Sequence, residues 1–138
     1  MARCDDYLSE ARKFRDVARK CDLPRYANQA VSNMELAVIA ANDAACLRLS
    51  NERPGGDSHH EAVRVLARSC KGTPWEEEAA QRGTQLTQVL QQKNAAQYGG
   101  GALPPQVAER VMKQGERFVE WAERLLASPD QTRQDGGP

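Results

Sequence analysis

The chain is poor in aromatic residues, in isoleucine and in net charge. Aromatic side chains make up 5% of its 138 residues, isoleucine occurs once, and 19 basic residues balance 19 acidic ones. The zero net charge excludes a globally basic nucleic-acid-binding protein, although it leaves room for a local basic patch. The shortage of β-branched residues, together with 20 alanines, indicates helices rather than sheets.

Long apolar runs and targeting signals are also missing. No apolar run approaches the roughly 20 residues that span a bilayer, and the first ten residues are polar rather than signal-like. We therefore expect a cytoplasmic protein without membrane contact. The four cysteines are widely spaced and form no CxxC or Cys–His cluster, so we expect free, partly buried thiols and neither a metal site nor a cofactor.

Apolar residues that recur every three or four positions predict five helices, over about 5–20, 25–49, 58–71, 74–98 and 104–126. Ser58 with Glu61, and Thr73 with Glu76, have the spacing of capping boxes. The second helix is alanine-rich and apolar on most sides, which predicts a central position. Residues 1–127 thus form one all-α domain, an up-down bundle of five helices, and 128–138 form a disordered polar tail.

Polar residues at two places are candidates for function. Asn42 and Asp43 interrupt the apolar second helix and need partners if they are buried. His59 and His60 begin the third helix, whose positive end disfavours the imidazolium form. One histidine could act as a neutral base or as a hydrogen-bond partner of Asp43; alternatively, both are exposed polar residues of a first turn.

A third candidate is the segment from Leu90 to Gly99. Lys93 borders the packed face of the fourth helix, Asn94 follows it, and the phenol of Tyr98 closes the segment. A cation, an amide and a phenol at one helix end could bind a phosphate or a base. The alternative is an ordinary amphipathic helix end with a snorkelling lysine.

These three places together resemble the HEPN superfamily of small prokaryotic helical domains, and most closely its stand-alone actinobacterial members. The resemblance spans about residues 7–126. It rests on residues 38–45 of the central helix, on 55–63, and on 90–99 followed by an amphipathic last helix. It implies a five-helix HEPN-like bundle, usually dimeric, that is linked to toxin–antitoxin or defence systems and has a nucleotidyltransferase-type or other operon partner.

Catalytic HEPN domains are metal-independent ribonucleases whose motif is an arginine, then four to six intervening residues, then a histidine. Here Lys93 and Asn94 match the arginine and the following polar position, but no histidine stands at 98–100. A phenol with a pKa near 10 is a poor base at neutral pH. Arg53 and His59 have a similar spacing, but they flank a Pro-Gly-Gly turn rather than a late helix, as expected of a chance match.

Three functions follow from these observations. The first is a non-catalytic module that binds RNA, a nucleotide or a partner protein. It would form a dimer through the second predicted helix together with either the fourth or the fifth. Its ligand-binding candidates are Lys93, Asn94, Gln97, Tyr98 and Asp43. The second is a metal-independent endoribonuclease, with candidate catalytic residues Lys93, Tyr98, His59 and His60. The third is a structural scaffolding bundle.

Overall fold

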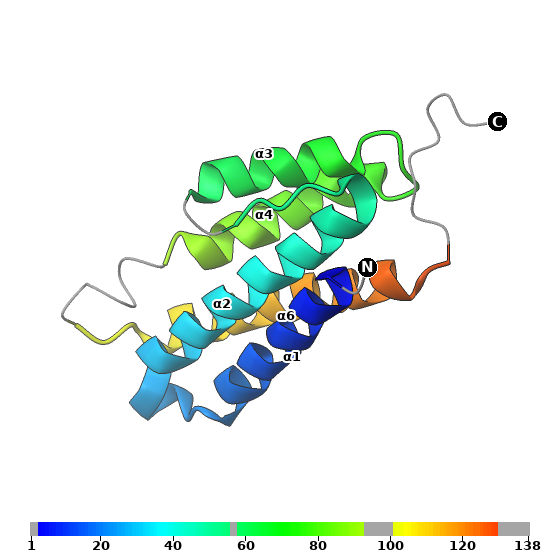
Figure 1. Cartoon of the computed structure of the whole chain (residues 1–138). Coiled ribbons are helices and arrows are strands. Elements are labelled where there is room, and N and C mark those ends of the chain that lie inside the picture. Colours follow the sequence, from blue (N-terminus) through cyan, green and yellow to red (C-terminus); the bar gives the residue numbers. More distant parts are fainter. Residues whose placement is uncertain (1–2, 56–57, 93–100, 130–138) are drawn as a thin grey trace.

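The computed structural model describes residues 3–55, 58–92 and 101–129. Within these ranges every regular element is helical, which confirms the all-α class. A short 3-10 helix, η1 (Glu76–Glu78), precedes the fourth helix. The five α-helices (Figure 1) are α1 (Arg3–Lys20), α2 (Leu23–Ser50), α3 (His59–Cys70), α4 (Ala79–Leu90) and α6 (Pro105–Ala127).

Helices α1 and α2 form an antiparallel hairpin joined by Cys21 and Asp22 (Figure 1). Helix α2 begins at Leu23, earlier than predicted, with Pro24 in its first turn. Proline is tolerated there because a first-turn N–H has no partner within the helix. On α1, Tyr7 and Phe14 are only half buried. The buried residues of α1 are Leu8, Ala11, Arg15 and Ala18.

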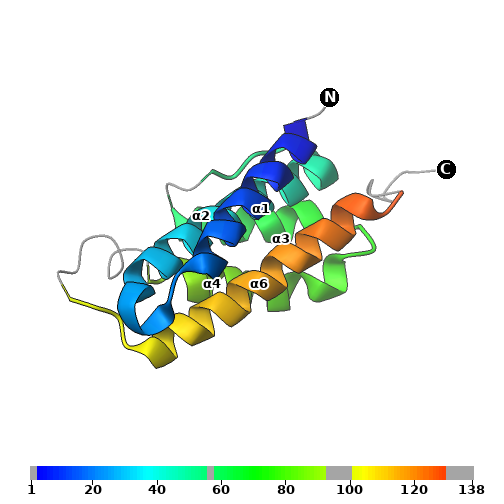
Figure 2. The ribbon, with the colours of Figure 1, turned by 90° about the horizontal axis from the view of Figure 1, so that it is seen from below.

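Helix α2 lies at the centre of the bundle, as its alanine content predicted. Helix α1 packs along one side of it and α6 along another (Figures 1 and 2). Small residues allow these helices to approach closely. At one such point Gly115 of α6 faces Met34 of α2. The alanines of α2 with no exposed surface are Ala30, Ala37, Ala41, Ala44 and Ala45.

Helix α3 runs in the same direction as α2. The Asn42 amide donates to the carbonyl oxygen of Ala62 at 3.4 Å, and eight residues further along α2 the Ser50 hydroxyl lies 2.7 Å from that of Ser69. Both helices therefore advance together, and the connection that starts at Asn51 leads back along α2 (Figure 1). In an up-down bundle consecutive helices are antiparallel. The predicted up-down arrangement therefore fails between α2 and α3, which run in the same direction.

The start of α3 was predicted correctly, and Ala62, Leu66 and Cys70 lie on its buried face as the apolar spacing predicts. The Ser58 hydroxyl accepts a hydrogen bond from the Glu61 backbone N–H at 3.3 Å, as in an N-cap. Val63 and Ala67, which share the same apolar spacing, are half buried and exposed, respectively. The full set of buried residues on α3 is Ala62, Val65, Leu66, Ser69 and Cys70.

The fourth helix begins later than predicted. The Thr73 hydroxyl accepts from the Trp75 N–H at 3.1 Å, and the Glu76 carboxylate accepts from the Gly72 N–H at 2.9 Å. These bonds close a turn one residue out of register with a capping box, so regular α-helix starts only at Ala79. The predicted continuation over 93–98 lies outside the described residues.

Helix α6 returns antiparallel to α1 (Figure 2). Its Glu123 pairs with Arg15 of α1. Its Glu116, two turns earlier on α6, pairs with Arg19, one turn further along α1. All five helices contribute to one hydrophobic core. Helix α6 ends at Ala127, where the predicted domain ends, and the disordered tail over 128–138 stays a prediction. No helix of the described ranges is long and apolar enough to cross a membrane.

Candidate functional site

The predicted ligand-binding residues Lys93, Asn94, Gln97 and Tyr98 lie outside the described residues. The described chain stops at Gln92 and resumes at Gly101. Both of these points are located at the end of the bundle where α3 begins, α4 ends and α6 begins (Figure 1). We call this region the α4 end.

The two predicted histidines lie at the α4 end because α3 and α4 are antiparallel (Figure 1). His59 is half buried, His60 is exposed, and their ring centroids are 4.1 Å apart. Neither ring forms a hydrogen bond with another described residue. A general base needs an acceptor that fixes its tautomer and its orientation, and the described structure gives these histidines none.

Asp43 has partners other than a histidine. Its side chain is 2% exposed and accepts hydrogen bonds from Arg53 Nε at 3.1 Å and from the Gly55 N–H at 2.9 Å. Burial raises the pKa of this carboxyl, and the bonds from Gly55 and Arg53 oppose the rise. These bonds fasten the connection after α2 to its helix, which satisfies the predicted need of Asp43 for partners.

Arg53 is likewise engaged in the fold. Besides its ion pair with Asp43, its guanidinium carbon lies 4.9 Å from the ring centroid of Tyr7. This cation–π contact links the connection after α2 to α1. Arg53 thus holds the connection after α2 against two helices, through Asp43 of α2 and Tyr7 of α1.

A polar cleft of about 150 Å³ lies between α4 and α6 at the α4 end. Arg110 supplies its positive charge and forms no ion pair with any residue of the described ranges. The polar cleft is lined by Gln88, Gln91, Gln92, Val107, Arg110 and Val111. Amide and guanidinium groups donate hydrogen bonds, which suits an anionic or nucleobase-like ligand.

Sequence reasoning missed the polar cleft. Arg110 is three residues after Val107 and next to Val111, so it borders the buried stripe of α6 much as Lys93 was predicted to border that of α4. The glutamines of α4 carried no signal, because their meeting with α6 depends on a contact between distant parts of the chain.

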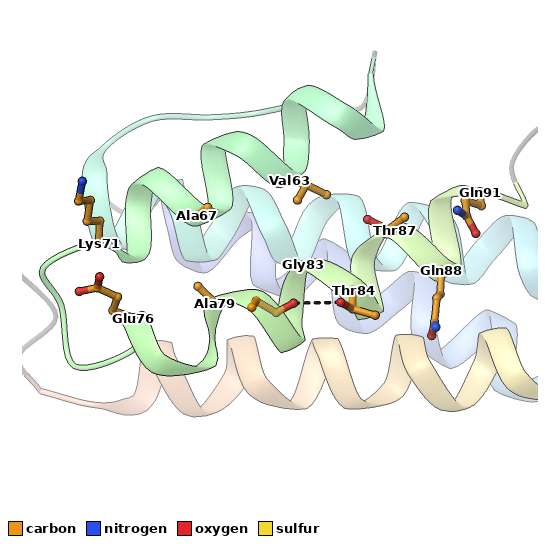
Figure 3. Close-up of a pocket in the computed structure, with 11 residues that line it drawn as sticks. Val63, Ala67, Lys71, Glu76, Ala79, Gly83, Thr84, Thr87, Gln88 and Gln91 are labelled. Atoms are coloured by element: carbon orange, nitrogen blue, oxygen red, sulfur yellow. Dashed lines mark hydrogen bonds between the residues drawn. The ribbon is translucent and has the colours of Figure 1, made fainter.

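A larger hollow, the α3–α4 groove, has a volume of about 690 Å³ (Figure 3). Val63 and Ala67 of α3 face Ala79 and Gly83 of α4 across it. Gln88 and Gln91 line both the groove and the polar cleft, so the two hollows adjoin at the α4 end.

The described residues contain no group of three or more His, Cys, Asp or Glu side chains that could hold a metal ion. Comparisons with models of protein families, with curated proteins and with solved structures found no match to this chain.

Proposed function

We propose that the protein is a HEPN-like, non-catalytic binding module that holds RNA or a nucleotide at the α4 end. Arg110 carries the proposal. It is a permanent cation in a cleft with three glutamines, and that cleft adjoins the point where the chain continues to Lys93 and Asn94. A guanidinium binds phosphate bidentately, and amides pair with the edges of bases.

The lack of a well-placed base supports binding rather than cleavage. No histidine follows Lys93 at the spacing of a HEPN ribonuclease motif. His59 and His60 lack an orienting partner among the described residues. A site that binds phosphate without a base to deprotonate the ribose hydroxyl retains its ligand instead of cutting it.

In a cell, we place this module in a toxin–antitoxin or defence system, as a homodimer with an operon partner such as a nucleotidyltransferase. The zero net charge supports a local contact, because the whole molecule exerts little attraction on a polyanion. The affinity for RNA should accordingly depend on a few cations. Because few phosphates are then neutralised, the affinity should fall only gradually as the salt concentration rises.

The test uses fluorescence anisotropy to measure how tightly the full chain binds a labelled single-stranded RNA and labelled ATP. Arg110→Gln and Lys93→Gln should each weaken binding at least tenfold. Arg117→Gln, two turns further along α6, removes the same charge outside the polar cleft and should have little effect. If wild-type protein bound neither probe, or if Arg117→Gln weakened binding as much as Arg110→Gln, the proposal would fail.

A metal-independent ribonuclease is the second candidate, and the position of the histidines favours it. Both lie at the α4 end, where the chain continues from Gln92 to Lys93 (Figure 1). This function predicts cleavage of single-stranded RNA in EDTA that is lost in the His59→Ala/His60→Ala variant. Retention of intact RNA by the wild-type protein would exclude it and favour the binding module.

A further inference from the structure

We infer that the α3–α4 groove is the surface on which a second copy of this chain docks, with the two copies related by a two-fold axis along the groove. This inference rests on the dimer of the proposed function and identifies its interface. It concerns residues separate from the polar cleft, except for Gln88 and Gln91 at their common border.

The outer face of α4 is free of charge. Over 79–92 every exposed or half-buried side chain is Ala, Thr or Gln, and the single charged residue, Arg82, is buried and bonded to Glu78 and Gln85. The exposed faces of α1 and α6, by contrast, carry charges throughout. Interface cores are depleted of charged residues because charges are costly to desolvate.

The shape of the groove also suits a helix. Its floor consists of small residues, and a Cβ atom on Gly83 would lie 3.3 Å from Val63 Cγ1, so α3 and α4 are already in close contact beneath it. On its rim, the Thr84 hydroxyl donates to the Ala80 carbonyl at 3.1 Å (Figure 3). Covering Thr84 would therefore leave no unpaired donor.

The charges at one end of the groove indicate that its occupant is a second copy. Lys71 and Glu76 lie at this end of the groove (Figure 3), and neither forms an ion pair with a residue of the described ranges. A two-fold contact places the same surface on both sides. An axis along the groove sets each end of the groove opposite the same end of the partner. Lys71 would then face the partner's Glu76 and Glu76 would face the partner's Lys71 at this end, while the uncharged α4 faces pack along the rest of the groove.

The experiment measures the mass of the full chain by sedimentation velocity over a concentration series. Wild-type protein should be a dimer, and Thr84→Arg, which places a cation on the groove, should raise the dissociation constant at least tenfold. Ser9→Arg is the control: it adds the same charge to the exposed face of α1, away from the groove, and should remain dimeric. Circular dichroism checks that each variant is folded.

Charge reversal tests the two-fold arrangement directly. Lys71→Glu and Glu76→Lys should each weaken the dimer, because each sets like charges opposite one another, and the double variant should restore it. A dimer that is unaffected by Thr84→Arg and by both reversals would overturn this interface while leaving the proposed dimer intact. A monomeric wild-type protein would overturn both the interface and the dimer, whereas RNA binding is measured separately.

Discussion

Gly115 on α6 faces the Met34 side chain on α2 so closely that a methyl group at position 115 would overlap Met34 Cγ and Sδ. Both residues are buried. The central helix and the last helix thus approach through a position where only a hydrogen atom fits. The distance between α2 and α6 is set by this pair.

Gly115→Ala is expected to destabilise the protein by about 1–3 kcal/mol, the usual cost of overpacking a core. Met34→Ala in the same chain should recover part of this loss, giving a favourable coupling of about 1 kcal/mol. Urea denaturation measures both quantities. Gly101→Ala is the control, because a Cβ there meets no atom within 4 Å. Additive effects of the two core substitutions would contradict the contact.

The bonds from Arg15 to Glu123 predict a pH-dependent stability. Arg15 is buried and donates to both carboxylate oxygens at 3.0 and 3.1 Å, and Arg12 adds a third bond at 2.7 Å. The bonds from Arg15 are the main reason that the pKa of Glu123 lies below its usual value; burial opposes this shift, and Arg12 contributes to it. The carboxylate therefore stabilises the fold above the unfolded pKa of about 4.3 and loses this effect as the pH falls through the folded pKa.

Glu123→Gln should accordingly cost about 2 kcal/mol at pH 7, because it leaves the buried guanidinium without its countercharge. The difference from wild type should narrow below about pH 4, where the wild-type carboxyl becomes protonated. Thermal melts at several pH values provide the measurement. Glu10→Gln, which removes an exposed carboxylate paired with Lys13, is the comparison and should change little at any pH. If the difference in melting temperature between Glu123→Gln and wild type stayed constant down to pH 3, the proposed role of the Glu123 carboxylate would be contradicted.

Asn28 fixes the chain where it returns to the bundle after residue 100. Its amide nitrogen donates to the Gly101 carbonyl at 3.0 Å, and its amide oxygen accepts from the Leu103 N–H at 2.8 Å. Asn28→Ala should cost about 1–2 kcal/mol and speed hydrogen exchange at the Leu103 amide. Asn28→Asp keeps the acceptor and should preserve more of that protection. Equal exchange rates in the two variants would show that the amide oxygen is not the acceptor.

Of the four cysteine thiols, we expect two to be reactive and two to be protected in the folded protein. Cys46 and Cys70 are wholly buried, and burial raises the pKa of each to about 12, whereas Cys4 and Cys21 are half buried. Because the thiolate is the reactive form, two thiols should react with Ellman's reagent in the native protein and four in urea. The Cys4→Ser/Cys21→Ser variant should show no rapid native reaction. A third fast thiol in wild-type protein would contradict the burial.

Local features of the fold could be predicted because they depend on residues close in sequence. The hydrophobic spacing predicts the five helices, and the alanines of α2 predict its central position. The need of Asp43 for buried partners was likewise evident from its place in an apolar helix. Its actual partners, Arg53 and Gly55, lie just beyond that helix and were recognisable only once the course of the connection was known.

Features that depend on distant contacts could not be predicted. Periodicity contains no information on helix direction, so the parallel course of α2 and α3 was missed. The same holds for the polar cleft: Gln88 and Arg110 are far apart in sequence and meet through the packing of α4 on α6. The capping motif at Thr73 and Glu76 was misread because the same residue types also close a turn.

The pairing of the first helix with the last also bears on how the protein folds and unfolds. Arg15 and Glu123 are separated by 108 positions, so bringing them together costs more chain entropy than forming a local contact, and we expect their bonds to form late in folding. Interactions that form after the transition state leave the folding rate nearly unchanged and instead slow unfolding. We therefore expect the contacts between α1 and α6 to affect the unfolding rate more than the folding rate, and in stopped-flow measurements Glu123→Gln should raise the unfolding rate.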